Sequence, residues 1–485
     1  MNKSLLFCAL LVTAAQPATA ESIEIGGKQR QYSVLQSEQP APGVTYRRLR
    51  FTDSDYLLNV NLLTVDLSNP GNRVETWCAK ESAKGIEAIT SAAKRLTTEQ
   101  FTPVAAANGN FWYCYGQNEY PTYNYIPRLL SIRNGVLVTE LNTGREKWDG
   151  GAKRNGAVGI TSDGHVYVDY FTPDYTLKMP TRDMNINLCN KGLSAKYATS
   201  GELCIYNSYY GRDRKFMFVE IDENKKLVID EKAADATEVL LDIDEGQTWM
   251  TARDISFTVK SVRTNAPAGT LGDHDLALVA RGKTKSKRLA ELKVGDQVKL
   301  NYSFLVTGKN VTPELEQAIC GNALVMRDGE LTEHNDNEEY NSMIYSRTGY
   351  GCDAGNRMLY IIVIDKSTDP VYGKSRGCST ADMCQIARHF GCTNMANFDA
   401  GGSAEMMYGG KIINTTTEST PRDVANGLMV FSTGSSAIES IGADAVSGRN
   451  EWYSVDGMRY DSMPDVPGIY IRRQGAATEK VFIGK

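Results

Sequence analysis

A strand–helix–strand pattern in the C-terminal half constrains the fold more than any other feature of the chain. Residues 358–364 form an uninterrupted apolar run, typical of a buried strand, that ends at Asp365. Residues 379–390 carry a helical apolar stripe, and a short strand at 394–398 then ends at Asp399. A crossover of this kind joins parallel strands, so both acids are predicted to lie at the same edge of one sheet.

Tight turns elsewhere predict a chain rich in sheet. Four turn pairs stand between β-prone runs: Asn134-Gly135, Asp163-Gly164, Asp328-Gly329 and Gly409-Gly410. Helices are predicted at 85–96, from Thr312 onward and at 379–390, where Ser379 or Thr380 caps the helix. The predicted fold class is α+β: a mixed β-sheet core with a few flanking helices, an antiparallel β insertion and a small C-terminal β tail.

With 485 residues, the chain exceeds one ordinary hydrophobic core. Residues 1–20 read as a signal peptide, with Lys3, an apolar run and a small-x-small cleavage site. No later run is long enough for a membrane span, so we expect a secreted, periplasmic or cell-surface protein without a transmembrane anchor. The predicted segments are a main domain at 21–431, an inserted β-rich subdomain at about 188–308, a linker at 432–444 and the tail at 445–485.

Charge and rare side chains exclude several classes of function. The net charge is −5, and no run of five basic residues occurs, which argues against nucleic acid as a partner. Four histidines are too few and too scattered to favour a His-based metal site, a Ser-His-Asp triad or a peptidase. Cys189 and Cys204 are a candidate disulfide, and four later cysteines are either buried thiols or disulfides: Cys352, Cys378, Cys384 and Cys392.

The segment 397–407 (NFDAGGSAEMM) is the main candidate for chemistry. It places Asp399 after an apolar strand, then Gly401 and Gly402, Ser403 and a second acid, Glu405. Glycine lets backbone approach a ligand closely, and an acid beside such a loop can act as a base or a nucleophile. The alternative is a tight turn with a surface aspartate.

An ordered set of motifs resembles the phosphodiester glycosidase family over roughly residues 45–432. The segments that carry the resemblance are Ala106–Phe111, Tyr206 with Gly211, Gly321–Val325, Asp328-Gly329, Ser346–Thr348, Asn397–Ser403, and Arg422 with Val424–Asn426. Three positions depart from the family pattern: Lys366 and Ala400 replace glycines, and Ala404-Glu405 replaces a pair of hydroxyl residues.

The resemblance implies hydrolysis of a sugar 1-phosphodiester, with a carbohydrate or sugar phosphate as substrate. Asp399 is then the nucleophile or base, with Asp365 and Glu405 as further catalytic acids. The implied substrate-binding residues are Asn108, Arg347, Gly401, Gly402, Ser403, Arg422 and Asn426. Of these, Arg347 suits the phosphate oxygens, the glycine amides with Ser403 suit an anion, and the asparagines suit sugar hydroxyls.

Each of these assignments has a structural alternative. Arg347 can pair with a buried acid, the asparagines can serve as turn residues, and Ser403 can cap a helix. The departures at Ala400 and Glu405 favour a second function, that of a non-catalytic carbohydrate-binding or cell-surface protein on the same fold. No cofactor is assigned; exposed acids near Asp399 leave room for a divalent cation such as calcium, although no EF-hand-like loop is present.

The C-terminal tail resembles the short β tails of many secreted proteins from Bacteroidetes-type bacteria. Tyr453–Gly457 and Pro467–Tyr470 carry this resemblance, which implies an export or surface module. The alternative is an additional hairpin of the main domain.

Overall fold

The computed structural model describes residues 21–98, 101–114, 123–141, 155–194, 201–224, 226–230, 235–418, 420–433, 450–454, 459–460, 468–474 and 477–483. The predicted signal peptide and nearly all of the predicted linker lie outside these residues. The chain divides into two compact units, Met1–Gly434 and Ser435–Lys485. The inserted subdomain predicted at 188–308 is not a separate unit in this division and stays a prediction.

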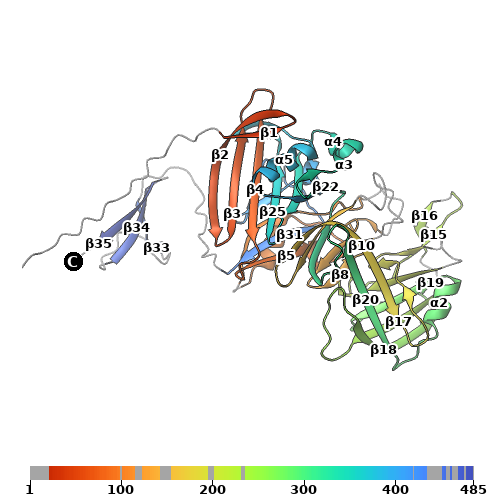
Figure 1. The fold of residues 1–485 in the computed structure, drawn as a ribbon. Coiled ribbons are helices and arrows are strands. Elements are labelled where there is room, and N and C mark those ends of the chain that lie inside the picture. The colour runs from red at the N-terminus through yellow and green to blue at the C-terminus, as the bar shows by residue number, and fades with distance from the viewer. Residues whose placement is uncertain are drawn as a thin grey trace, which may run out of the picture. The chain divides into compact units, whose positions relative to one another are not determined.

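The central sheet of the first unit has nine strands, and all its neighbouring strands are antiparallel (Figure 1). Their spatial order is β1 (Glu21–Ile25), β2 (Lys28–Ala41), β3 (Val44–Phe51), β4 (Leu58–Asp66), β25 (Met358–Ile364), β24 (Arg347–Cys352), β28 (Asn394–Asn397), β22 (Ala323–Arg327) and β23 (Glu330–Leu331). Because β24 runs antiparallel to both β25 and β28, these two strands are parallel to each other. The predicted crossover is therefore confirmed, with one strand between its two ends.

A five-stranded sheet, called the small sheet here, packs against one face of the central sheet. It contains β30 (Lys411–Ile412), β29 (Met406–Tyr408), β6 (Pro103–Asn108), β31 (Asn426–Ser432) and β5 (Asn72–Cys78). Val363 and Ala396 of the central sheet share a buried core with Ala107 and Leu428 of the small sheet. The two sheets therefore meet face to face, with their inward side chains between them.

Helices cover the outer faces of this sandwich. Helix α5 (Thr380–His389) buries Met383 and Ile386 against Ile362 of β25, and Figure 1 shows it beside the central sheet. Helix α1 (Ile89–Leu96) packs on the outer side of the small sheet. Three short helices occur elsewhere: α2 (Lys283–Leu289), α3 (His334–Asn337) and α4 (Glu339–Ser342).

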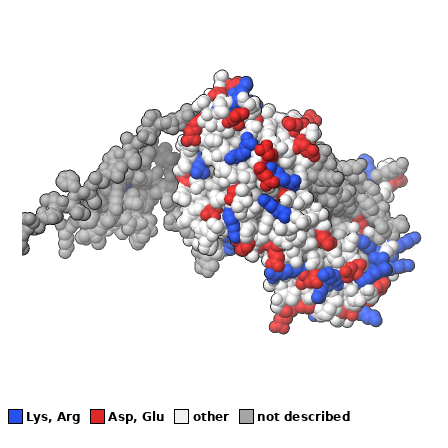
Figure 2. Space-filling view, in the orientation of Figure 1, with Lys and Arg blue, Asp and Glu red and all other residues white. Residues whose placement is uncertain are grey.

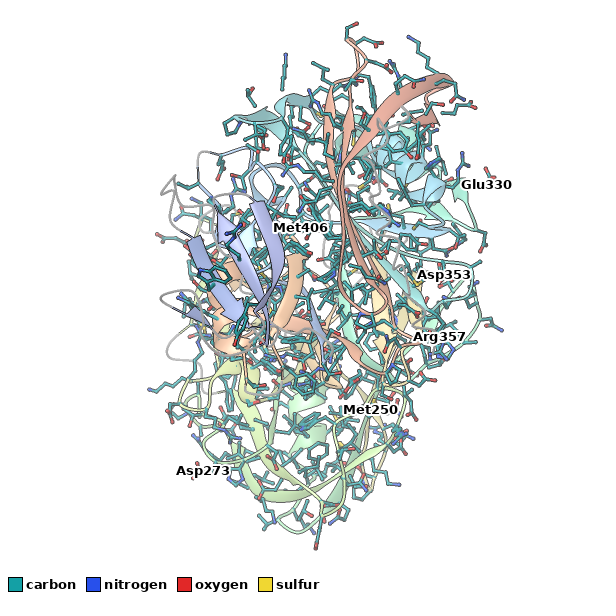
Figure 3. All side chains as sticks on the ribbon, turned by 90° about the vertical axis from the view of Figure 1, so that its left-hand side faces the viewer. Met250, Asp273, Glu330, Asp353, Arg357 and Met406 are labelled. Carbon is teal, nitrogen blue, oxygen red and sulfur yellow. The ribbon has the colours of Figure 1, made fainter. Side chains whose placement is uncertain are left out.

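The large sheet has twelve strands and extends away from the sandwich. It contains β12 (Leu188–Cys189), β14 (Glu202–Tyr206), β19 (Leu276–Arg281), β17 (Ala236–Ile243), β18 (Ile255–Thr264), β20 (Gln297–Val306), β10 (Val166–Lys178), β9 (Gly156–Thr161), β21 (Leu315–Cys320), β7 (Ser131–Arg133) and β8 (Val136–Thr139), with β11 (Met184–Asn185) beside β10. Val158, Val168 and Ile319 of this sheet also line the core between the other two sheets. In Figure 3, Met250 and Asp273, which lie in loops between strands of this sheet, are labelled below Met406.

Smaller strand groups complete the described chain. The first unit also contains β13 (Leu193–Ser194), β15 (Phe218–Ile221), β16 (Leu227–Ile229), and the hairpin of β26 (Lys366–Asp369) and β27 (Gly373–Arg376). The second unit is a four-stranded antiparallel sheet with the order β33 (Arg459–Tyr460), β32 (Asn450–Ser454), β34 (Gly468–Gln474) and β35 (Ala477–Ile483). The predominance of strands with few helices agrees with the predicted α+β class.

Local sequence signals were accurate at the hairpins. All four predicted turn pairs join antiparallel strands: β7 to β8, β9 to β10, β22 to β23, and β29 to β30. Asp328 and Gly329 both have positive φ, 49° and 82°, as a two-residue hairpin turn of this type requires.

Two other local predictions were wrong. The helix predicted from Thr312 is absent, and this segment leads into β21, which pairs with both β9 and β7. The candidate disulfide is absent as well, because Cys189 and Cys204 are free thiols that donate to different carbonyls. Cys352, Cys378, Cys384 and Cys392 are free and buried, which agrees with the first of their two interpretations.

Charged side chains of both signs are spread over the surface that Figure 2 presents. Lys and Arg gather over the region where Figure 1 places α2, whose sequence is KTKSKRL. Within the described residues, no helix is both long enough and apolar enough to cross a membrane.

The N-cap of α5 offers a test of how firmly the crossover is anchored. Ser379 accepts a hydrogen bond from the Asp382 N–H at 3.1 Å. Replacing Ser379 with Ala is expected to lower the free energy of unfolding by about 1 kcal/mol, measured by urea denaturation, because that N–H loses its partner. The matched change Ser91→Ala, at an exposed position inside α1, is expected to have almost no effect. Equal losses in both variants would contradict the capping role.

Candidate functional site

The candidate site forms where the edges of the central and small sheets meet. Asp399 follows the end of β28, Asn108 ends β6, and Asn426 begins β31. Glu405 directly precedes β29, whose first residue, Met406, is labelled in Figure 3. Residues 399–405, called the glycine loop here, cross from one sheet to the other.

Asn108 is the junction between the two sheets. Its side-chain Nδ2 donates to the Asp399 carbonyl at 2.7 Å, while Oδ1 accepts from the Thr348 hydroxyl at 2.7 Å and from the Glu405 N–H at 3.1 Å. Asn108 is 1% exposed. Its amide is therefore used to hold the two ends of the glycine loop rather than to face solvent.

Asn426 has a comparable buried role. Its Oδ1 accepts from the Asn110 N–H at 2.8 Å, and its Nδ2 lies 3.2 Å from Asn110 Oδ1 and 3.3 Å from the Ser131 hydroxyl. Both asparagines predicted to contact sugar thus have their polar atoms engaged within the protein.

Asp399 is half-buried at the start of the glycine loop. Its Oδ1 accepts from the Ala400 N–H at 3.0 Å, and the Ser403 hydroxyl and the charges of Arg422 and Arg128 also stabilise its ionised form. Burial outweighs these effects and raises the pKa of Asp399 to about 7. A carboxyl group with this pKa can exchange a proton near neutral pH.

Arg422 links the glycine loop to the next loop of the chain. Its Nη1 donates to the Ser403 hydroxyl at 3.2 Å, and its guanidinium forms an ion pair with Glu418. The side chains of Arg422 and Glu418 are 38% and 48% exposed. Arg422 therefore lies beside Asp399 with part of its guanidinium open to solvent.

The two glycines of the loop have different local reasons, close packing at Gly402 and a positive φ at Gly401. A Cβ at Gly402 would lie 2.5 Å from Arg422 Nη2 and 2.6 Å from Glu418 Oε1, while Gly401 has a φ of +64°. The N–H groups of Ser403 and Ala404 donate to carbonyls of Ala400 and Gly401 within the turn. Gly402 thus lets the Arg422–Glu418 pair lie directly against the loop.

Glu405 lies beneath this surface. It is 0% exposed; its Oε1 accepts from the Arg422 backbone N–H, and its Oε2 has no hydrogen-bond partner among the described residues. Burial raises its pKa to about 7. In this position Glu405 fixes the backbone of Arg422 and has no open side toward a substrate.

Arg347 is also fully buried. It is 0% exposed, and its Nε and Nη2 donate to the backbone carbonyls of Cys378, Tyr340, Asn341 and Met343. The rings of Tyr340 and Tyr345 lie 5.3 and 5.4 Å from its guanidinium carbon. Arg347 therefore holds the segment 340–343 against β24, an environment that argues against its predicted contact with phosphate.

Asp365 lies at the same sheet edge as Asp399. Successive side chains of β25 face opposite sides of the central sheet, and Asp365 follows Ile361 and Val363, which face the small sheet. Its neighbours are Arg48, Asn414 and Thr415, whose N–H lies 3.3 Å from Asp365 Oδ2. Because β24 separates their strands, the backbones of β25 and β28 are about 10 Å apart. The two acids are not brought together as a pair.

Sequence reasoning missed three residues near Asp399. Arg128 contributes positive charge to the carboxylate, and Glu418 pairs with Arg422. Burial raises the pKa of the phenol of Tyr340 in α4, and the nearby charge of the Asp399 carboxylate raises it further. Glu418 and Arg422 lie in a loop, where a spacing of four residues predicts no contact, and Arg128 stands in no motif.

Comparison with known proteins identifies a related family. The sequence profile of the phosphodiester glycosidase family matches part of the chain.

Residues 253–431 match the phosphodiester glycosidase family.

The resemblance inferred from the motifs is confirmed for this segment, which contains Arg347, Asp365, the glycine loop, Arg422 and Asn426. Asn108 lies outside it. No curated protein matches the chain by sequence.

Solved structures that resemble the chain include three proteins of different origin. A candidate exported protein of Burkholderia pseudomallei aligns with a TM-score of 0.60 and 15% identity, covering 86% of this chain and 100% of its own. A hypothetical protein from Synechocystis aligns with a TM-score of 0.55 and 16% identity over 81% of this chain, which spans 62% of that protein's length. The catalytic domain of zebrafish N-acetylglucosamine-1-phosphodiester alpha-N-acetylglucosaminidase, auto-inhibited by its pro-peptide, aligns with a TM-score of 0.37 and 13% identity, covering 84% and 88%. The first two similarities establish a shared fold.

Metal ligands are not gathered at this edge. Within the described ranges, no group of three or more His, Cys, Asp or Glu side chains is arranged to hold a metal ion. Calcium therefore has no assigned ligands here.

Asp365 offers a test of the cost of burying an acid. Burial raises its pKa from 3.8 to about 7, so the folded protein binds more protons than the unfolded chain between about pH 4 and 7. Stability from this group is therefore fully present below about pH 4 and is lost as the pH rises to 7. Asp365→Asn is expected to raise the free energy of unfolding at pH 8 by a few kcal/mol at most, and to change it little at pH 4.

Thermal or urea unfolding from pH 4 to 8 measures this difference. The matched change Asp213→Asn, at an exposed position, is expected to leave the pH profile unaltered. A wild-type-like profile for Asp365→Asn would contradict the stated effect of burial.

Proposed function

We propose that the protein is an exported hydrolase that cleaves a sugar 1-phosphodiester, with Asp399 as the reacting carboxylate. The single observation that carries the proposal is the position of Asp399 in a segment that matches the phosphodiester glycosidase family, partly exposed and flanked by Arg422 and Arg128. Among the three acids predicted from the sequence, Asp365 and Glu405 are both 0% exposed. Asp399 is the one that a substrate can reach.

The positive charge beside Asp399 suits an anionic substrate. A phosphodiester carries one negative charge, which a lone carboxylate would repel. The part-exposed guanidinium of Arg422, next to Ser403, can donate hydrogen bonds to phosphate oxygens in a planar, two-point contact. We therefore assign phosphate recognition to Arg422, with Arg128 as a second cation, in place of Arg347.

The reaction needs one ionised carboxylate at the anomeric carbon. As a base, Asp399 takes a proton from water, the water oxygen bonds to the anomeric carbon, and the bond to the phosphate oxygen breaks. As a nucleophile, its own oxygen bonds to that carbon first, and water releases the sugar afterwards. In both cases the electron pair leaves with a phosphomonoester, which is a good leaving group without strong protonation.

Removal of the carboxylate tests the central assignment. Asp399→Asn is expected to reduce sugar release from a panel of sugar 1-phosphodiesters by at least about 10³-fold, with the melting temperature unchanged or higher. Activity of the wild-type protein should increase with pH through about 7, as Asp399 ionises. The exposed neighbouring change Asp423→Asn serves as the control. Full activity in Asp399→Asn would overturn the role of this residue.

Exchange of the cation tests phosphate recognition separately. Arg422→Lys keeps the charge but loses the planar contact, so kcat/KM should fall by roughly 10- to 100-fold. Arg388→Lys, at an exposed position on α5, should leave kcat/KM unchanged. Competitive inhibition by inorganic phosphate should weaken in Arg422→Lys in parallel. Unchanged inhibition in that variant would refute the assignment.

A non-catalytic carbohydrate-binding role is the second candidate. It is favoured by the complete internal use of the Asn108 and Asn426 amides and by the burial of Glu405, which leave few groups for catalysis. This role predicts glycan binding without product. Turnover by the wild-type protein on any ester of the panel would exclude it.

A further inference from the structure

A basic surface that the proposed reaction does not use lies on the large sheet, at α2. Residues 282–293 (GKTKSKRLAELK), called the basic segment here, contain one acid, Glu291, and five cations: Lys283, Lys285, Lys287, Arg288 and Lys293. Figure 2 shows Lys and Arg gathered over the region where Figure 1 places α2. Because the whole chain has a net charge of −5, this positive charge is a local feature.

Helix α2 presents three cations to solvent. Its inner side is fixed to the large sheet: Leu289 is buried in the core, and the Ser286 hydroxyl lies 2.8 Å from a threonine hydroxyl of β17. Successive residues of an α-helix are about 100° apart around its axis, so Lys283, Lys287 and Arg288 point away from this side. Lys283 and Lys287 are exposed, and Arg288 is half-buried. These three residues are called the cationic face here.

The charges of the cationic face are not neutralised within the described part of the chain. None of its three residues forms an ion pair there, whereas Arg281, just before the helix, pairs with Asp230 and Asp235 at 2.7 and 2.8 Å. Arg95 of α1 likewise pairs with two glutamates. The cationic face therefore keeps its positive charge available to a partner outside the chain.

Helix stability does not account for this pattern. Lys283 and Lys287 are four residues apart, and like charges at that spacing repel each other on a helix. Lys283 is also the first residue of α2, where the helix dipole disfavours a cation, and the first turn contains no acid. Lys287 and Arg288, in the last turn, suit the dipole. The placement of Lys283 is therefore better explained by contact with an anionic partner.

The turn that follows α2 favours a lipid surface as that partner. Val294, the residue after Lys293, is 68% exposed. Basic residues beside an exposed aliphatic side chain suit a bilayer, because anionic headgroups lie directly above the apolar acyl region. Leu289 is turned into the protein core, so α2 cannot insert its own apolar side. The contact is therefore with the lipid phosphates, with Val294 as a single apolar addition.

We propose that the basic segment is a docking surface for an anionic bilayer, which holds the exported protein beside a membrane through the headgroup phosphates. Cations close to a charged membrane bind it electrostatically, and dissolved salt screens this attraction. The contact is therefore reversible and weakens as the salt concentration rises. The proposal is independent of the reaction proposed for Asp399, since no residue of the glycine loop takes part.

Vesicle co-sedimentation tests the proposal on the chain from residue 21 onward, which lacks the predicted signal peptide. Vesicles of phosphatidylcholine and phosphatidylglycerol should bind the protein at low salt, and vesicles of phosphatidylcholine alone should not. The triple variant Lys283→Gln/Lys287→Gln/Arg288→Gln should bind the anionic vesicles about 100-fold more weakly, at roughly fivefold for each cation. Raising the salt concentration to about 0.5 M should release the wild-type protein.

A matched triple variant separates this surface from the overall charge. Lys94→Gln/Lys374→Gln/Lys411→Gln removes the same charge at exposed positions on α1, β27 and β30, and it should keep the affinity within about threefold. Melting temperatures show whether both variants are folded. Equal losses in the two triple variants, or no binding of the wild-type protein to the anionic vesicles, would overturn the proposal. Tighter binding to soluble polyglutamate than to the vesicles would assign the surface to an acidic protein and would overturn it as well.

Discussion

The buried amide of Asn108 is the interaction on which the site depends. It stands at the end of a small-sheet strand and bonds to the first residue of the glycine loop, to the last acid of that loop and to a hydroxyl of the central sheet. Each of these groups is buried or partly buried, so removal of the amide would leave several of them unsatisfied at once. The same side chain therefore joins the two sheets at this edge and holds the backbone of Asp399.

Local sequence signals predicted the strand and the helix near this junction, but not which strands pair with one another. The apolar run 358–364 and the capped helix after it formed as predicted, since burial and capping act within a few residues. The segment after Pro313 carried a helix-start signal, yet it became β21. There, pairing with β9 and β7 and full burial of Leu315 and Ala318 outweighed the local preference.

The same limit explains which part of the site could be predicted. A crossover places the ends of β25 and β28 at one edge, and this much followed from the pattern. Side chains alternate between the two faces of a strand, so the face of each one depends on its position along the strand. It also depends on β24, which precedes β25 in the chain but lies between β25 and β28 in the sheet. Arg347 shares the parity of Gly349, which packs on Met383 of α5, so it points into the helix layer. Only the completed sheet reveals that Arg347 and Asp365 face different cores.

Three acids near this edge have a pKa raised to about 7, and burial is the main cause for each. Their titration alone therefore does not identify a reacting group. Asp365 accepts from the Thr415 N–H and Glu405 from the Arg422 N–H, whereas Asp399 combines partial exposure with two neighbouring guanidinium groups. Those cations offset the repulsion between an ionised carboxylate and an anionic diester. The arrangement that distinguishes Asp399 is thus the one that its proposed substrate would require.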